Sequence, residues 1–226
     1  MSKEIPAIMI AGGRSRDPAL MARMMSRAFH GIEKPVVAYI GTANGDNLAF
    51  FQMMKVILKN SGANKVNFVR LAKKNPDLDA AREALAAADL VFLSGGEVED
   101  GINWLNKHGL TGFLKELYSS GKPFLGVSAG VIMMGTHWVH WDIEGDDNTA
   151  RLFDCLGFVP FIFDTHGEEE DWVELKTALK LLGNGSRGYG LPGGSMVSAD
   201  SKGALVNLEK EYIVFANEGG KISIIK

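Results

Sequence analysis

Ser128 is the residue whose neighbours point most directly to chemistry. It lies between two glycines in Gly126-Val127-Ser128-Ala129-Gly130, with apolar residues at 123–125 before the motif and at 131–134 after it. A serine at a sharp strand-to-helix turn is held in a strained conformation that exposes its hydroxyl. The amides that open the next helix can stabilise an oxyanion. The motif predicts a nucleophilic serine, and the alternative is a Gly/Ser-rich connector after a buried strand.

A serine hydroxyl needs a base to accept its proton, and the usual base is a histidine oriented by a carboxylate. His166 is the best-placed candidate, because it follows the apolar segment 158–163 and precedes Gly167. Histidines that emerge from strand ends into loops lie where open sheets collect catalytic residues.

The other four histidines fit different roles. His30 is expected at the end of a helix, and His108 in a solvated loop. His137 and His140 are followed by Asp142 and could be interpreted as metal ligands. Residues three apart on a strand point to opposite faces, however, so we expect no metal site there.

The acid that would orient His166 is not singled out by the residue pattern. Four candidates lie between the serine and the histidine: Asp142, Glu144, Asp146 and Asp147. At least three of these four must belong to a solvated acidic loop.

Two glycine pairs follow predicted strands. Gly95-Gly96 comes after the apolar run 90–93 and suits a second oxyanion donor, since glycine lets the backbone approach a substrate closely. Gly12-Gly13 follows the first strand but lacks the remaining glycine of a dinucleotide-binding motif. We therefore expect it to be substrate-side backbone.

The elements that must position these residues alternate between strand-length apolar runs and segments of helical period, which predicts a mainly parallel sheet. The predicted strands are Ala7–Ala11, Val36–Ile40, Lys65–Val69, Leu90–Leu93 and Pro123–Val127. The predicted helices are a first one capped by Asp17 and begun by Pro18, then 47–60, 79–88, and a segment within 100–119 that can break at His108-Gly109.

Beyond residue 134 the pattern changes. Strands are predicted at 138–141 and 157–163, and an amphipathic helix at 169–182 with acids in its first turn. Short, antiparallel strands are predicted near the C-terminus at 196–199, 204–208, 212–215 and 222–225.

Composition narrows the class of protein. With 226 residues, 46% of them hydrophobic, residues 1–226 suffice for a single α/β domain. A net charge of −3 and dispersed basic residues argue against nucleic-acid or membrane partners. The run at 5–11, interrupted by Pro6, fits a strand better than a signal peptide. The single cysteine, Cys155, excludes an intrachain disulfide and is compatible with the cytoplasm.

Several motifs together resemble the dipeptidase E and cyanophycinase family of serine peptidases. They are Gly12-Gly13, Leu93-Ser94-Gly95-Gly96, the motif around Ser128, and the segment 153–160 that leads to His166. The resemblance implies a class I glutamine amidotransferase-like fold, with a flavodoxin-like parallel sheet flanked by helices on both faces.

The resemblance also implies roles for residues. Ser128 would be the nucleophile, His166 the general base, and Glu144 the acid, with Asp142 as the second choice. Gly96 and Ala129 would form the oxyanion hole. Gly12, Gly13, Gly95 and Glu97 would line the substrate site.

The expected activity is cleavage of a small peptide by a dipeptidase E-like exopeptidase, without metal or organic cofactor. The four acids at 168–171 cannot hold an anion, so Asp-Xaa specificity is not expected. An α/β-hydrolase-type esterase and a non-catalytic amidotransferase-like binding protein remain alternatives. Such domains often support dimers, so a homodimer also stays open.

Overall fold

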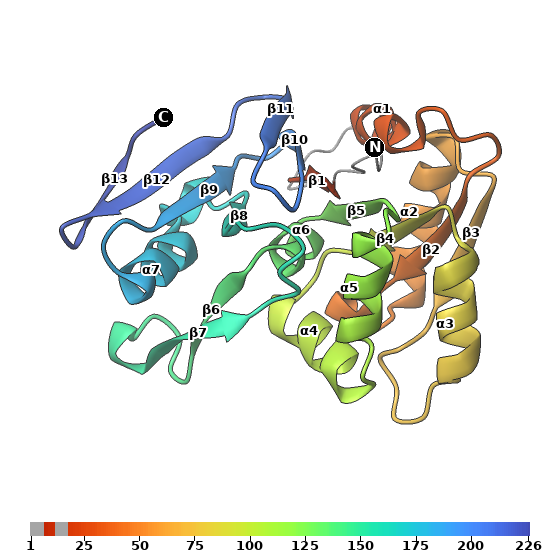
Figure 1. Cartoon of the computed structure of the whole chain (residues 1–226), viewed down its shortest axis with the longest axis horizontal. Coiled ribbons are helices and arrows are strands. Elements are labelled where there is room, and N and C mark those ends of the chain that lie inside the picture. Colours follow the sequence, from red (N-terminus) through yellow and green to blue (C-terminus); the bar gives the residue numbers. More distant parts are fainter. Residues whose placement is uncertain (1–6, 12–17) are drawn as a thin grey trace.

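A seven-stranded, mostly parallel sheet forms the centre of the fold in this computed structural model, which describes residues 7–11 and 18–226 (Figure 1). Strands β1, β5, β4, β2 and β3 are parallel neighbours in that order, and β10 and β11 add an antiparallel extension beyond β1. Their bounds are β1 Ala7–Ile10, β2 Val36–Ile40, β3 Lys65–Val69, β4 Leu90–Leu93, β5 Phe124–Val127, β10 Met196–Ala199 and β11 Leu205–Glu209. The predicted fold class is confirmed.

Helices cover both faces of this sheet because its central strands are apolar on both sides. In β2, Val37 and Tyr39 pack toward α1 and α2, whereas Ala38 and Ile40 pack toward the other helices. The helices are α1 Pro18–Ser26, α2 Leu48–Asn60, α3 Leu78–Ala87, α4 Val98–Lys107, α5 Thr111–Ser119 and α6 Ala129–Met134. The predicted break at His108-Gly109 is confirmed, since it separates α4 from α5. Within the described ranges no helix is long and apolar enough to cross a membrane.

A second sheet lies at the end of the molecule opposite β3 and α3 (Figure 1). Its order is β13-β12-β9-β8, with β8 parallel to β9. Helix α7 packs between this sheet and a separate hairpin, β6–β7. The bounds are β6 His137–Trp141, β7 Ala150–Asp154, β8 Phe163–Thr165, α7 Val173–Leu182, β9 Arg187–Leu191, β12 Ile213–Glu218 and β13 Lys221–Ile224.

Two predicted elements in this half are wrong in extent. The strand expected at 157–163 begins only at Phe163, because the preceding segment contains Gly157 at φ 60° and Pro160, and its backbone bonds to the end of α6. The helix expected from Glu169 begins at Val173, since Asp171 and Trp172 adopt left-handed conformations. The acids at 168–170 form a separate 3₁₀ turn.

Strand β9 was not predicted, and its glycines explain why. Gly188 and Gly190 interrupt the apolar pattern, yet α7 packs directly over them: a Cβ at Gly188 would lie 2.6 Å from Leu175 Cδ1, and one at Gly190 would lie 2.9 Å from Trp172. His108, expected in a solvated loop, is instead buried, with Nε2 2.9 Å from the Leu71 carbonyl. This ring ties the end of α4 to the segment after β3.

Candidate active site

Ser128 occupies a strained elbow between β5 and α6. Its backbone has φ 54° and ψ −122°, a conformation that L-residues rarely adopt. The flanking glycines are required by close packing: a Cβ at Gly126 would lie 2.6 Å from the Gly130 carbonyl, and one at Gly130 would lie 2.2 Å from the Leu93 carbonyl. The Ser128 amide is held by the Ile10 carbonyl at 3.1 Å. The elbow therefore fixes the serine at the carboxyl edge of the central sheet.

His166 meets this serine from the second sheet. It follows β8 with φ 48°, and its amide donates to the Leu191 carbonyl at 2.8 Å, which continues the pairing with β9. Its side-chain Nε2 lies 2.8 Å from Ser128 Oγ. When the neutral ring carries its proton on Nδ1, Nε2 accepts from the serine hydroxyl. A histidine in this state can act as the base for the serine.

The turn after β4 faces the elbow. A Cβ at Gly95 would lie 3.2 Å from Ser128 Cβ, so the two backbones are close neighbours. Gly96 has φ 142°, a conformation open to glycine. Among the residues that the structure describes, the amides of Gly96 and Ala129 have no hydrogen-bond acceptor. Two free donors on neighbouring turns suit stabilisation of an oxyanion.

Asn44 supports this turn and was missed at the sequence level. Its Nδ2 donates to the Gly95 carbonyl at 3.0 Å and also contacts Ser94 Oγ. The 3₁₀ turn Thr42–Asn44 follows β2, the neighbour of β4, and the Glu97 amide donates to the Ala43 carbonyl at 2.7 Å. The available signal was the position of Asn44 after a predicted strand, at the same sheet edge as Gly95.

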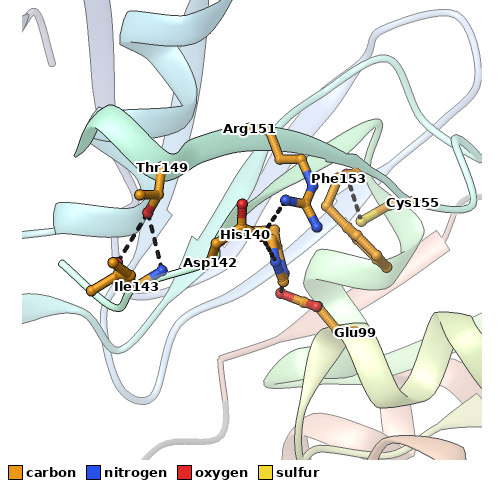
Figure 2. Close-up of polar contacts among 8 residues, drawn as sticks. All are labelled: Glu99, His140, Asp142, Ile143, Thr149, Arg151, Phe153 and Cys155. Atoms are coloured by element: carbon orange, nitrogen blue, oxygen red, sulfur yellow. Dashed lines mark hydrogen bonds and ion pairs between the residues drawn. The ribbon is translucent and has the colours of Figure 1, made fainter. Parts of the chain in front are cut away.

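Asp142 takes part in a different network (Figure 2). Its Oδ1 lies 2.5 Å from Arg151 Nη1 and 3.2 Å from His140 Nε2. The other nitrogen of the His140 ring, Nδ1, is 2.6 Å from Glu99 Oε1 in the first turn of α4. The hydrogen bonds from Arg151 and then His140 lower the pKa of Asp142. This network joins the hairpin β6–β7 to α4.

Glu144 lies exposed in the turn after β6. Its described influence is on Glu174 in α7: burial raises the pKa of Glu174, and the nearby charges of Glu170, Glu144 and Glu97 raise it further. Neither Glu144 nor Asp142 has a described contact with His166. Gly12 and Gly13 lie outside the described residues.

Asp164, two residues before His166, is a buried carboxyl that the sequence reading did not single out. Its side chain accepts a hydrogen bond from the Thr165 amide at 2.6 Å, while Oδ2 has no hydrogen-bond partner among the residues that the structure describes. Burial, followed by the charge of Glu174, raises its pKa to about 8. Asp164 is therefore mainly protonated at neutral pH.

The two histidines of the hairpin do not converge on one point. His140 binds Glu99 and Asp142, whereas His137 Nε2 lies 3.5 Å from Asp154. In the described part of the chain, no group of three or more His, Cys, Asp or Glu side chains could hold a metal ion.

A strained serine that is hydrogen-bonded to a histidine beside free backbone amides, on a parallel α/β sheet, defines a serine hydrolase. The sequence matches the model of peptidase family S51 over residues 7–206. The chain therefore belongs to peptidase family S51 and is a serine-type peptidase, which confirms the resemblance to the dipeptidase E family.

Solved structures share the fold. A peptidase E candidate from Listeria monocytogenes EGD-e superposes with a TM-score of 0.67 at 16% identity, covering 92% of this chain and 99% of its own. A peptidase from an acI-B1 Actinobacterium gives a TM-score of 0.65 at 15% identity, covering 98% of this chain and 94% of its own. No curated protein matches the sequence.

Proposed function

We propose that this serine peptidase is an exopeptidase for small peptides, with Ser128 as nucleophile and His166 as general base and acid. The observation that carries the proposal is the 2.8 Å hydrogen bond between Ser128 Oγ and His166 Nε2 at a strained elbow. Such a pair activates a hydroxyl that is otherwise a poor nucleophile.

In the proposed reaction, Ser128 Oγ attacks the scissile carbonyl carbon as its proton passes to His166 Nε2. The amides of Gly96 and Ala129 would hold the developing oxyanion. His166 then gives the proton to the leaving amine, and the C–N bond breaks to leave an acyl-serine. A water molecule then gives a proton to His166 and attacks the ester carbonyl. The ester C–O bond breaks, the carboxylic acid product leaves, and His166 returns the proton to Ser128 Oγ.

Acidic side chains near the site bear on the substrate. Glu97 follows the oxyanion turn. Its negative charge, together with the charges of Glu144 and Glu170, raises the pKa of Glu174. A negatively charged surrounding disfavours a substrate carboxylate and favours an ammonium group. A small peptide with a free α-ammonium fits this surrounding better than an Asp-Xaa peptide does.

Two measurements with matched variants test the proposal. Ser128→Ala should lose peptide hydrolysis and labelling by a fluorophosphonate probe while keeping its circular dichroism spectrum. Ser120→Ala, an exposed serine at the end of α5, should retain both activities. Turnover or labelling that persists in folded Ser128→Ala would contradict the assignment of the nucleophile.

A further inference from the structure

The second ring nitrogen of His166, Nδ1, has no hydrogen-bond partner among the described residues. The inference drawn from this rests on the proposed function, in which His166 is the base. In the described ranges, the only side-chain hydrogen bond of His166 is the one between its Nε2 and Ser128 Oγ. In the Ser-His-Asp arrangement, a carboxylate at Nδ1 of the histidine fixes the tautomer and stabilises the imidazolium. The residue that supplies this carboxylate therefore sets the tautomer of His166 and the stability of its imidazolium.

Three other acids are poorly suited to the role. Asp142 is bound by Arg151 and His140 on the hairpin. Asp164 is buried and mainly protonated at neutral pH, and a neutral carboxyl cannot offset the charge of an imidazolium. Glu144 lies in the turn after β6, a strand that is not part of the sheet that carries His166, whereas Glu168, equally exposed, follows His166 in the same turn.

Glu168 is held where β8 and β9 end. Its Oε1 accepts a hydrogen bond from the Gly193 amide at 2.8 Å. Two residues earlier, the His166 amide donates to the Leu191 carbonyl at 2.8 Å. The turn from His166 to Glu168 is thus fastened at both ends to the segment that leaves β9. Glu168 Oε2 makes no hydrogen bond to any described residue.

The turn from His166 to Glu168 also packs against buried side chains. A Cβ at Gly167 would lie 3.0 Å from the ring of Trp172 and 3.1 Å from Asp164 Oδ2, so the turn rests on these two buried side chains. The Trp172 amide donates to the Gly167 carbonyl at 2.9 Å. Glu168 therefore starts from a backbone position that is fixed relative to His166.

We propose that Glu168 is the positioning carboxylate of His166, with Oε2 accepting the Nδ1 proton in a hydrogen bond that forms when substrate binds. Hydrogen bonds of catalytic groups are often long without substrate and tighten in the complex. The proton from Ser128 moves only to Nε2, the Nδ1 proton stays on the ring, and Glu168 remains ionised. The imidazolium then lies between the substrate and a fixed negative charge.

The test uses Glu168→Gln, which keeps an oxygen for the Gly193 amide but removes the charge. We expect kcat for a hydrolysed dipeptide to fall by about 10²-fold or more, with KM changed by less than about threefold. Because the carboxylate stabilises the imidazolium, its loss should also move the acidic limb of the kcat/KM profile to lower pH. Glu168→Asp should recover part of the lost kcat.

Glu169→Gln, which removes the same charge from the same turn, is the matched control and should retain kcat within about threefold. The inference is overturned if Glu168→Gln keeps full activity, if its acidic limb does not move, or if Glu144→Gln produces the loss and the shift instead. If Ser128→Ala loses activity and any of these results is also found, the assignment of Ser128 as nucleophile stands and only the role proposed for Glu168 is rejected.

Discussion

Gly96 lies against the carbonyl of Ala43 so closely that a Cβ at this glycine would be 2.1 Å from the oxygen. The contact joins the turn after β4 to the turn after β2, and the Glu97 amide donates to the same carbonyl. Any side chain at position 96 must move a backbone amide that we place in the oxyanion hole.

Gly96→Ala should therefore lower kcat by about 10²-fold or more, the size of effect seen when one oxyanion donor is lost. Steady-state kinetics on a hydrolysed dipeptide would measure it. Gly109→Ala is the matched control, because Gly109 also has a positive φ (63°) but open space around it. Equal losses in both variants would show that backbone strain alone, rather than the contact with Ala43, is responsible.

Ser128 stores backbone strain that glycine would release. At φ 54° and ψ −122°, Ser128→Gly should raise the free energy of unfolding by about 1 kcal/mol relative to Ser128→Ala. Urea denaturation of the two variants measures the difference. Equal midpoints and slopes would indicate that the elbow is unstrained.

Asp164 should make stability depend on pH. Its folded-state pKa of about 8 lies above the ordinary value of 3.8, so its contribution is complete below about pH 4 and is lost as pH rises through about 8. Asp164→Asn cannot ionise. Between pH 5 and pH 8.5, we expect the free energy of unfolding of the wild type to fall relative to this variant, on the order of a few kcal/mol. Parallel curves would contradict a raised pKa.

Glu99 Oε1 and His140 Nδ1 lie 2.6 Å apart, and this contact should stabilise the packing of the hairpin β6–β7 against α4. Glu99→Ala is expected to cost about 1 kcal/mol and to speed amide exchange in residues 137–154 several-fold. Asp100→Ala removes a neighbouring acid from the same helical turn and should leave the hairpin unchanged. Exchange that is equally fast in both variants would assign the effect to the helix terminus.

The preference of the enzyme for the charge of its substrate should depend on the acidic residues around the site. In a dipeptide library, we expect a higher kcat/KM for peptides with basic first residues than for Asp-Xaa peptides, and this ratio should shrink at high salt. Glu97→Gln should also reduce the ratio of kcat/KM for peptides with basic first residues to kcat/KM for Asp-Xaa peptides. Preferential Asp-Xaa cleavage would show that the acids face away from the substrate.

The residues predicted best from sequence are those whose signal is local. The glycines around Ser128 are needed for an elbow whose geometry involves only the adjoining strand and helix, and the apolar runs of the parallel strands are buried on both faces. His166 was found by its place after an apolar segment, and the structure brings it to Ser128. Its role as a base, like the role of the serine, stays a prediction.

Residues whose partners are distant in sequence could not be found in this way. The contact of Asn44 with Gly95 depends on β2 and β4 being neighbours, and the burial of Asp164 depends on α7. Strand β9 was hidden by glycines whose reason is the packing of Trp172 and Leu175 over them. The assignment of Glu144 as the acid, with Asp142 as the second choice, rests on a family resemblance and stays a prediction.

The serine and the histidine come from different sheets and from different stages of the chain. The five parallel strands and the elbow lie within residues 7–130, whereas His166 follows β8, which pairs with β9, a strand that ends at Leu191. A chain growing from a ribosome would thus extend for some sixty residues beyond the elbow, from residue 130 to Leu191, before strand β9 is complete. The proposed nucleophile and the proposed base would therefore meet only once most of the fold has formed.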